Sequence, residues 1–467
     1  MSVASADAWA AHTEGVQRLL ASYRAIPADA AVRLAKPTSN LFRARAKNAG
    51  PGLDTSGLNG VIAVDPQART ADVAGMCTYE DLVAVTLRYG LSPLVVPQLK
   101  TITLGGAVTG LGIESASFRN GLPHESVLEM DILTGTGDIV RAAPDEHSDL
   151  FRAFPNSYGT LGYSVRLKIE LEPVKPFVAL RHLRFRSLTD LIEAMDRIVE
   201  TGGLNGDRVD YLDGVVFSAD ESYLCVGIQS ATPGPVSDYT GSDIYYRSIQ
   251  HEDGEKHDRL TIHDYLWRWD TDWFWCSRAF GAQNPRLRRW WPRRYRRSSF
   301  YWKLIGYDQR FDIADRIETR SFRSPGRSLR ERVVQDVEVP IGRTAEFLDW
   351  FLDNVPIEPI WLCPLRLRDS GNSVGGWPLY PLSPHAGYVN IGFWSSVPAG
   401  SDEGHTNKMI ERKVSELHGH KSLYSDAYYS PEEFDELYGG EIYKTVKKTY
   451  DPDSRFLELY AKAVQRR

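Results

Sequence analysis

The sequence has few cysteines and no long apolar run. Its 467 residues include only four cysteines, and no two of them form a CxxC pair, so it indicates neither a disulfide framework nor a zinc site. No apolar segment reaches the ~18 to 20 residues that a membrane-spanning helix needs, and the amphipathic N-terminus lacks the apolar segment of a signal peptide. These absences predict a cytoplasmic protein, either soluble or bound to a membrane surface.

The chain also lacks an excess of positive charge. It carries 55 basic and 61 acidic side chains, for a net charge of -6, and this balance gives no reason to expect nucleic acid as a partner. With 42% hydrophobic residues, the chain is long enough for two or three domains with cores of their own.

The first third of the chain predicts an α+β domain over residues 1–175. Residues 60–75 alternate around a Pro66 turn, which favours a strand pair, and residues 78–90 predict a helix that ends at Gly90. Two apolar runs around residues 134–138 indicate a hairpin. Strands and few helices without regular βαβ alternation are typical of an α+β domain.

The rest of the chain predicts a second domain and a helical tail. Two strand and helix units, at residues 177–200 and 333–355, lie on either side of an insertion. We therefore expect an antiparallel sheet backed by helices over residues 176–425. Residues 426–467 form the helical tail.

Residues 101–121, "TITLGGAVTGLGIESASFRNG", contain five glycines. Glycine allows the backbone to approach a ligand closely, so such a loop can direct several N-H groups at one anion, and a diphosphate is the obvious ligand. Neither GxxxxGK[ST] nor GxGxxG is present, which excludes a typical P-loop or Rossmann site. The alternative is that the glycines only mark tight turns.

A family resemblance rests on the order of several motifs. The glycine loop, "LEMDILTGTGDIV", "DLFRAFPNSYGTLGYSVRL" and the terminal "YDPDSRF" together resemble the PCMH-type FAD-binding domain of the vanillyl-alcohol oxidase flavoproteins. Within that superfamily, "GLGIESASFRNGL", "VVQDVEVP", "PIWLCPL" and "LYSDAYYSPEEF" resemble the Δ24-sterol reductases, and the likeness covers nearly the whole chain. The sequence is also similar to bacterial flavoproteins that reduce a 10-methylene fatty acyl chain to its 10-methyl (tuberculostearic) form.

The resemblance implies that FAD lies across the glycine loop and that the helical tail returns to the FAD domain. The residues expected near its diphosphate and ribityl chain are Thr101, Thr103, Gly105, Gly106, Gly110, Gly112, Ile113, Glu114 and Ser115. A first loop would contribute Lys36, Thr38, Ser39 and Asn40, the adenine end Gly162 and Val165, and the segment after the second loop Gly121 and His124. Many relatives carry a His or Cys in one of the loops that bonds to the flavin. Neither loop has one here, so we expect non-covalent FAD, with His124 as the exception to consider.

The resemblance further implies reduction of an isolated C=C bond in a lipid, with NADPH as electron donor. The first expectation is a 10-methylene fatty acyl chain of a phospholipid, made by a partner methyltransferase upstream. The alternatives are a Δ24-sterol-type side chain, an oxidase of a hydroxylated small molecule, and a non-enzymatic flavin-stabilised lipid-binding protein. Because an isolated alkene needs a proton as well as a hydride, an acid must lie within ~3 Å of the alkene carbon or relay through water.

Residues in the second domain and the tail supply candidates for this acid. They are Asp336, Glu338, His385, Tyr424, Asp426 and Tyr428. The alternative for Asp336 and Glu338 is the polar face of a half-buried strand, and a lone loop histidine is more often only solvated. The sequence does not choose between them.

The insertion, residues 265–307, is basic and aromatic. Residues 273–307 contain eight Arg, one Lys and no Asp or Glu, and seven of the twelve tryptophans lie in or beside them. Trp suits the membrane interface and Arg reaches anionic headgroups, so we expect peripheral attachment at the inner face of the cell membrane through Arg288, Arg289, Trp290, Trp291, Arg293 and Arg294. A subunit interface and a single-stranded nucleic acid site are the alternatives. The oligomeric state is not predicted.

Overall fold

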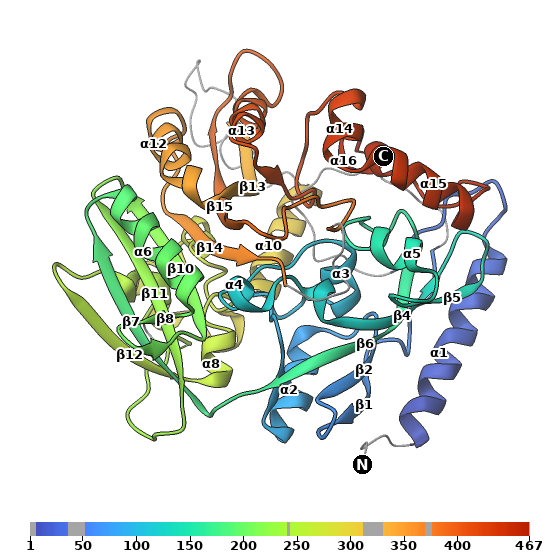
Figure 1. Ribbon diagram of the computed structural model, residues 1–467, viewed down its shortest axis with the longest axis horizontal. Coiled ribbons are helices and arrows are strands. Elements are labelled where there is room, and N and C mark those ends of the chain that lie inside the picture. The colour runs from blue at the N-terminus through green and yellow to red at the C-terminus, as the bar shows by residue number, and fades with distance from the viewer. Residues whose placement is uncertain (1–5, 36–51, 241–242, 312–329, 369–375, 467) are drawn as a thin grey trace.

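The computed structural model describes residues 6–35, 52–240, 243–311, 330–368 and 376–466 (Figure 1). The fold is α+β, as predicted, with one six-stranded and one eight-stranded sheet. Within these ranges no helix is both long and apolar enough to cross a bilayer.

The first sheet is antiparallel and has the order β1-β2-β6-β4-β5, with β3 paired to the end of β6. Its strands are β1 Val61–Asp65, β2 Thr70–Ala74, β3 Leu91–Pro93, β4 Val127–Leu133, β5 Ile139–Ala142 and β6 Tyr163–Pro173. The predicted hairpin is the β4-β5 turn, in which the Thr134 amide donates to the Asp138 carbonyl over 3.0 Å. The predicted strand pair at 60–75 is β1-β2.

Short helices surround this sheet. They are α1 Ala6–Ala25, α2 Tyr79–Thr86 with the 3-10 turn η1 Leu87–Tyr89, α3 Leu104–Thr109, α4 Ser117–Asn120, η2 Pro123–Ser126 and α5 Ser148–Ala153. The helix predicted to end at Gly90 does so, because Gly90 adopts the left-handed φ of 66° that closes η1.

The second sheet is antiparallel throughout, in the order β12-β7-β11-β10-β14-β15-β13-β16. Its strands are β7 Phe177–Phe185, β10 Tyr211–Ser218, β11 Glu221–Ser230, β12 Glu255–Thr261, β13 Arg330–Pro340, β14 Ile360–Arg366, β15 Gly387–Pro398 and β16 His420–Lys421. A separate two-stranded ribbon consists of β8 Gly203–Leu204 and β9 Asp207–Arg208.

Helices α6 Leu188–Thr201, α12 Thr344–Asn354 and α13 His405–Glu416 cover the outer face of the second sheet (Figure 1). Helix α6 follows β7, and α12 follows β13 after the 3-10 turn η5 Ile341–Arg343. These are the two predicted strand and helix units. Alternate residues of the strands, such as Val337 and Ile391, pack against these helices.

The inner face of the second sheet packs against the first domain. One continuous core contains Val73 and Leu167 of the first sheet, Val215 and Trp361 of the second, and Trp269 of the insertion. We call this cluster the shared core, since it joins the two sheets.

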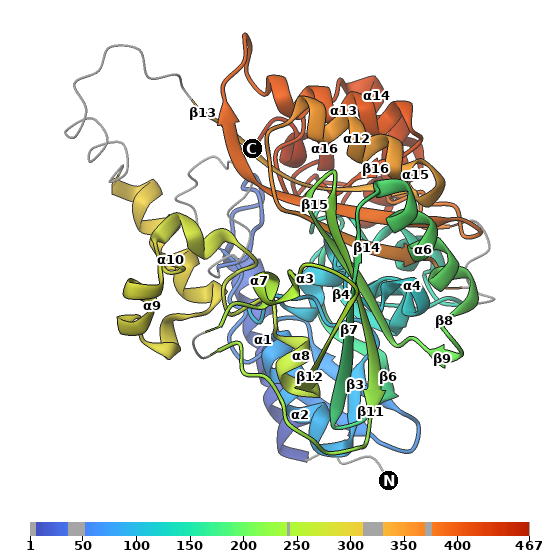
Figure 2. The ribbon, with the colours of Figure 1, turned by 90° about the vertical axis from the view of Figure 1, so that its left-hand side faces the viewer.

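The insertion forms a helical layer beside both domains (Figure 2). It contains η3 Cys276–Phe280, α9 Pro285–Trp290, η4 Arg293–Tyr295 and most of α10 Ser298–Phe311, and the helices α7 Tyr245–Ile249 and α8 Ile262–Leu266 lead into it. Five of the seven tryptophans in or beside it are buried and so do not face a membrane: Trp267, Trp269, Trp273, Trp275 and Trp302.

The tail packs on the first domain (Figure 1). Helices α14 Pro431–Leu437, α15 Gly440–Tyr450 and α16 Leu459–Ala463 follow β16. The buried Lys447 ammonium donates to the Thr160 carbonyl over 2.8 Å and pairs with Asp451 at 2.6 Å. The tail is therefore fixed to the loop that precedes β6.

Candidate flavin and substrate site

The glycine loop begins as the N-terminus of α3 and passes close to the first sheet. The Thr103 hydroxyl accepts from the Gly106 amide and caps the helix. A Cβ at Gly105 would lie 2.6 Å from both the Gly75 carbonyl oxygen and the Ser164 hydroxyl oxygen. Glycine at this position therefore lets α3 lie directly on β6 and fixes where the loop starts.

The second half of the loop is held by its carbonyls. The Asn156 amide donates to the Gly110 carbonyl over 2.6 Å, and the Gln98 amide donates to the Ile113 carbonyl over 2.9 Å. Within the described part of the chain, the backbone N-H groups of Leu111 and Gly112 have no protein acceptor. A buried N-H group that lacks an acceptor fits a ligand that brings one, such as a diphosphate.

The other predicted cofactor residues lie around this loop. Gly162 has a φ of 140° and lies directly before β6, next to the end of β4. The Val165 side chain is buried toward α1, so only its backbone could contact a ligand. Gly121, with a φ of 68°, closes α4. Lys36, Thr38, Ser39 and Asn40 lie outside the described residues.

His124 is buried against Trp377 of the second domain. Its ring lies edge-on to Trp377, with 4.5 Å between centroids, and neither ring nitrogen has a hydrogen-bond partner among the described residues. Burial lowers the pKa of His124 to about 3, so the imidazole is neutral.

A buried ion network joins the loop to the second sheet. Arg268 donates to Glu114 of the loop over 2.9 Å and to Asp213 of β10 over 2.8 Å. The indole N-H groups of Trp269 and Trp361 also donate to Asp213, each over 3.2 Å. Burial raises the pKa of Glu114 above its ordinary value, and the arginine opposes that shift.

Polar side chains follow one row across the inner face of the second sheet. Residues paired in register point to the same face, and the row consists of Glu338, Asn390, Cys363, Asp213, Cys225 and His182. We call it the polar row. All six side chains are at most 1% exposed.

Several atoms of the polar row have no hydrogen-bond partner among the described residues. They are Glu338 Oε2, Asn390 Oδ1, Asp213 Oδ1 and both ring nitrogens of His182. Because buried polar groups are normally paired, these unpaired atoms mark the row as a polar surface within the core. The N-H groups of the glycine loop thus fit the diphosphate of FAD.

Comparison with known proteins agrees with this fit. The family model described as "FAD binding domain" matches residues 4–143. This chain is an FAD-binding flavoprotein. The flavoprotein is 28% identical over 420 residues to the Δ24-sterol reductase of Mus musculus, an alignment that covers 86% of this chain and 75% of the relative.

Two further relatives show how far along the chain the similarity extends. The Δ24-sterol reductase of Arabidopsis thaliana is 23% identical over 449 residues, covering 88% of the flavoprotein and 76% of the relative. Cytokinin dehydrogenase 9 of Oryza sativa subsp. japonica is 29% identical over 145 residues, covering 31% of the flavoprotein and 27% of the relative. The likeness to the Δ24-sterol reductases therefore includes the second sheet.

Two of the predicted acids, Asp336 and Glu338, lie on the inner face of β13. Asn390 donates to Asp336 over 3.1 Å, and Ser422 donates to Glu338 over 3.1 Å. Burial raises the pKa of Asp336 to about 6 and that of Glu338 to about 8, and the charge of Asp336 adds to the second shift. Near neutral pH this pair therefore keeps a proton on Glu338.

Aromatic rings surround the Asp336 end of this pair. The Trp394 indole N-H donates to the Tyr424 hydroxyl over 2.9 Å, and the Tyr424 hydroxyl faces the Asp336 carboxyl. Phe274, Trp275 and Trp361 pack on Trp394 with ring centroids 4.5, 5.3 and 6.5 Å away. We call Phe274, Trp275, Trp361 and Trp394 the aromatic wall.

The backbone of the wall is strained at its base. Trp273 and Phe274 have φ values of 48° and 57°, in the left-handed region that bulky residues rarely adopt. Hydrogen bonds from their amides to the carbonyls of Asp270 and Trp269, over 3.1 and 2.9 Å, maintain this turn. Strain of this kind persists where the surrounding structure over-determines the conformation, which is common at functional sites.

The remaining acid candidates lie elsewhere. His385 is on an exposed loop next to Ser383, so it does not join the pair. Asp426 bonds Arg332 over 3.3 Å, and Tyr428 packs beneath Arg466. The structure brings only Asp336, Glu338 and Tyr424 together.

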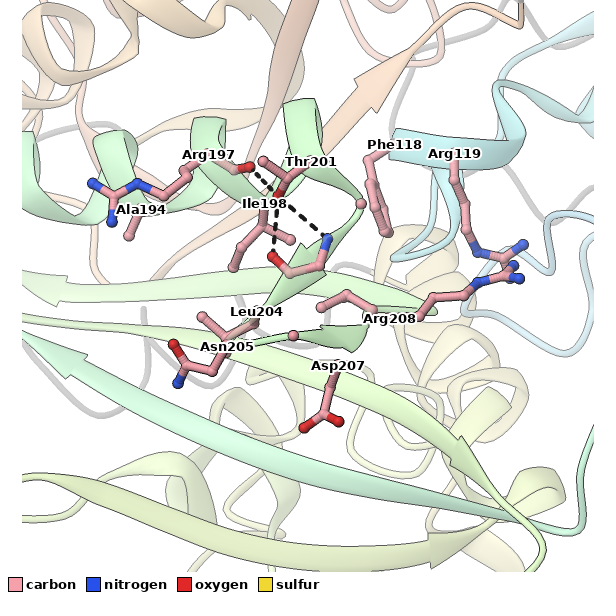
Figure 3. Close-up of a pocket in the computed structure, with 14 residues that line it drawn as sticks. Phe118, Arg119, Ala194, Arg197, Ile198, Thr201, Leu204, Asn205, Asp207 and Arg208 are labelled. Atoms are coloured by element: carbon pink, nitrogen blue, oxygen red, sulfur yellow. Dashed lines mark hydrogen bonds between the residues drawn. The ribbon is translucent and has the colours of Figure 1, made fainter.

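A separate hollow lies on the opposite side of the second domain. It has a volume of about 780 Å³ between α4, the end of α6 and the β8-β9 ribbon, and Phe118, Arg197 and Arg208 are among the residues that line it (Figure 3). None of the predicted acids lines it. We therefore do not assign the substrate to this hollow.

Sequence reasoning missed Arg268, Asp213 and Asn390. Asp213 gave a usable signal, since it is a lone acid inside the apolar run "YLDGVV". The sequence contains no signal for Arg268, because it lies 154 residues from Glu114 and within the basic insertion.

Proposed function

We propose that this flavoprotein is an FAD-dependent reductase of an isolated C=C bond in a lipid, with NADPH as electron donor. The observation that carries the proposal is the position of Asp336 and Glu338 on the inner face of β13, where burial raises both pKa values and Tyr424 links Asp336 to the aromatic wall. An apolar alkene suits this wall, and its reduction requires a proton that water in an apolar site does not supply.

The residues would act in a defined order. Glu338, protonated below about pH 8, resupplies Asp336, and the Asp336 carboxyl or the adjoining Tyr424 hydroxyl delivers the proton to the less substituted alkene carbon. The C=C π bond supplies the electron pair for the new C-H bond and leaves a tertiary cation. FAD, when bound and reduced by NADPH, supplies the hydride that completes the saturated product. The carboxyl pair then regains its proton from solvent.

The aromatic wall would stabilise the cation. Each desolvated aromatic face contributes up to ~2 kcal/mol to a nearby cation. The faces of Phe274, Trp361 and Trp394 belong to one cluster. It reaches from the Tyr424 hydroxyl beside Asp336 to the ion network, where the Trp361 indole donates to Asp213.

Two lipid alkenes fit this chemistry. The relatives are named Δ24-sterol reductases, which supports a sterol side chain. The motif resemblance to the 10-methylene reductases supports a fatty acyl chain of a phospholipid. In both, protonation at the less substituted carbon gives a tertiary cation.

The test is anaerobic mixing of the FAD-loaded protein with NADPH, followed by either alkene. We expect NADPH to bleach the flavin, one of the two lipids to restore its colour, and mass spectrometry to find a product two hydrogens heavier. The Glu338→Gln and Asp336→Asn variants should still be bleached but should re-oxidise at least about 100-fold more slowly with the alkene, as for loss of a general acid.

The matched control is His385→Gln, an exposed residue that should change neither step. Bleaching by a hydroxylated substrate with rapid re-oxidation by air would identify an oxidase and refute the proposal. Bound FAD with no turnover of either alkene would also refute it.

A further inference from the structure

Helix α9 and the turn after it present an exposed apolar and basic surface. Trp290 is 81% exposed, and Leu287 is 53% exposed on the same six-residue helix. The arginines at 286, 289, 293 and 294 are exposed around them. We call these six residues the α9 face; Figure 2 shows α9 projecting from the side of the molecule.

Trp290 stands out among the exposed apolar side chains of the described residues. The others of this kind, Trp9, Tyr89, Leu128, Val236 and Ile442, are between 36% and 51% exposed and lie on different elements. An indole that keeps four-fifths of its surface in water next to an exposed leucine marks an interaction surface rather than ordinary scatter.

The α9 face is supported from below by one buried charge pair and a second buried arginine. Arg288 points inward and forms two bonds with the Asp272 carboxylate, over 2.6 and 3.1 Å. Arg296 is also buried and donates to the Trp291 carbonyl over 3.0 Å. The prediction that Arg288 faces a membrane is therefore wrong, and Trp291 is half-buried against Phe300 and Tyr301. Arg289, Trp290, Arg293 and Arg294 are exposed as predicted.

The charge of the face is almost entirely positive. No Asp or Glu occurs between residues 273 and 307. Asp238 approaches Arg293 at 3.4 Å, but both side chains are more than half exposed, so water screens this pair. A surface with four cationic side chains around an apolar tip complements anionic headgroups over an apolar layer.

We propose that the α9 face docks on anionic lipid bilayers, with Leu287 and Trp290 entering the headgroup region and the four arginines contacting lipid phosphates. Trp and Leu side chains partition into that region, and one arginine guanidinium can donate two parallel hydrogen bonds to a lipid phosphate. A bilayer fits better than nucleic acid, because Trp290 and Leu287 project from a convex helix instead of lining a groove that tracks a strand. This inference goes beyond the proposed reductase function and does not depend on it.

The position of the face fits the delivery of a lipid. A short segment, residues 269–275, contains Asp272, which pairs with Arg288 beneath α9, and Phe274 and Trp275 of the aromatic wall. The face that docks and the Phe274 and Trp275 rings of the wall thus belong to one insertion.

The test is sedimentation of the FAD-loaded full-length protein with vesicles. One set is phosphatidylcholine alone, and the other contains about 30% phosphatidylglycerol, each over a range of salt from about 0.05 to 0.5 M. We expect binding to the anionic vesicles at low salt, loss of that binding as salt screens the charges, and little binding to phosphatidylcholine.

Two variants of the face are compared with matched controls. R289E/R293E/R294E should weaken binding at least about 100-fold, since each arginine near an anionic surface contributes about 5-fold. L287S/W290S should weaken it about 10-fold or more and leave the salt dependence in place. The controls are R88E/R197E/R412E, with the same change in net charge at exposed sites elsewhere, and L128S/I442S; both should bind as the wild type does.

Several results would overturn the proposal. They are no binding to anionic vesicles at low salt, equal loss of binding in the charge controls, and binding to single-stranded oligonucleotide in place of vesicles. A change of oligomeric state in the face variants with vesicle binding intact would assign the face to an interface between copies of this chain. Turnover of detergent-dispersed alkene should be the same in all variants, so failure here is distinguishable from failure of the proposed reductase.

Discussion

Replacing Arg268 by methionine tests the buried ion network directly. The guanidinium bonds Glu114 and Asp213 over 2.9 and 2.8 Å, and all three side chains are at most 5% exposed. Arg268→Met keeps most of the apolar stem and leaves two buried carboxylates without their cation. Breaking a buried pair by removing one partner costs about 3 to 5 kcal/mol.

That cost sets the expected change in thermal stability. At about 2 °C per kcal/mol, the low end for a large cooperative unit, the melting temperature should fall by about 6 to 10 °C near neutral pH. Burial raises the pKa of Glu114, and without Arg268 it rises further. Since a raised pKa costs stability only where the group is ionised, the deficit should grow as pH rises through that value and shrink toward pH ~4.5, near the ordinary pKa of glutamate.

The assay is differential scanning fluorimetry at saturating FAD, at about pH 7.5 and pH 4.5. Arg186→Met is the control, because Arg186 and Asp253 form a pair of similar length, 2.9 Å, that is 65% and 81% exposed, and its loss should leave the melting temperature unchanged. The double variant E114Q/R268M should recover part of the deficit, as the cycle of a coupled pair requires. A fall of less than about 2 °C in R268M, or an equal fall at both pH values, would refute the electrostatic reasoning.

Three further predictions follow from other features. Gly105→Ala places a Cβ 2.6 Å from the Gly75 carbonyl oxygen, so it should destabilise the first domain by about 1 to 3 kcal/mol and release FAD. The control Gly60→Ala meets no atom within 4 Å and should do neither. Thermal melting and flavin retention after gel filtration measure the two effects. Lys447→Met should remove the buried anchor of the tail, which limited proteolysis would detect as early cleavage after residue 425, and protection equal to the wild type would contradict it. The rate of alkene reduction should decline as pH rises through about 8 in the wild type, the pKa of Glu338. In Glu338→Gln it should decline as pH rises through about 6, because Asp336 alone then holds the proton. If stopped-flow rates fall at the same pH in both proteins, the pair is not the acid.

The sequence predicted the parts of the fold that local rules determine. Strand alternation, the turn at residues 134–138 and the closing glycine at Gly90 all depend on neighbours within a few positions, and each was confirmed. The glycine cluster likewise indicated close backbone approach, which Gly105 shows against β2 and β6. The spacing of Asp336 and Glu338 predicted that both lie on one face of a strand, but it did not show whether that face is exposed to solvent.

The parts that failed depend on distant contacts. Tryptophan is equally suited to a core and to a membrane interface, so composition alone did not show that Trp269 and Trp275 pack inside. Within the arginine run, one side chain pairs with a buried acid and its neighbours face water, and only the direction of a six-residue helix separates Arg288 from Arg289. The polar row is invisible in the sequence, because its six members come from six different strands.

The shared core has a consequence for how a substrate reaches the site. Domains joined by small polar interfaces open and close as rigid bodies by default, but a large apolar interface makes such hinge motion costly. Here residues of both sheets and of the insertion belong to a single hydrophobic cluster. Under the proposed reductase function, we therefore expect a lipid tail to enter by local displacement of side chains and loops at the insertion, while the two sheets keep their separation.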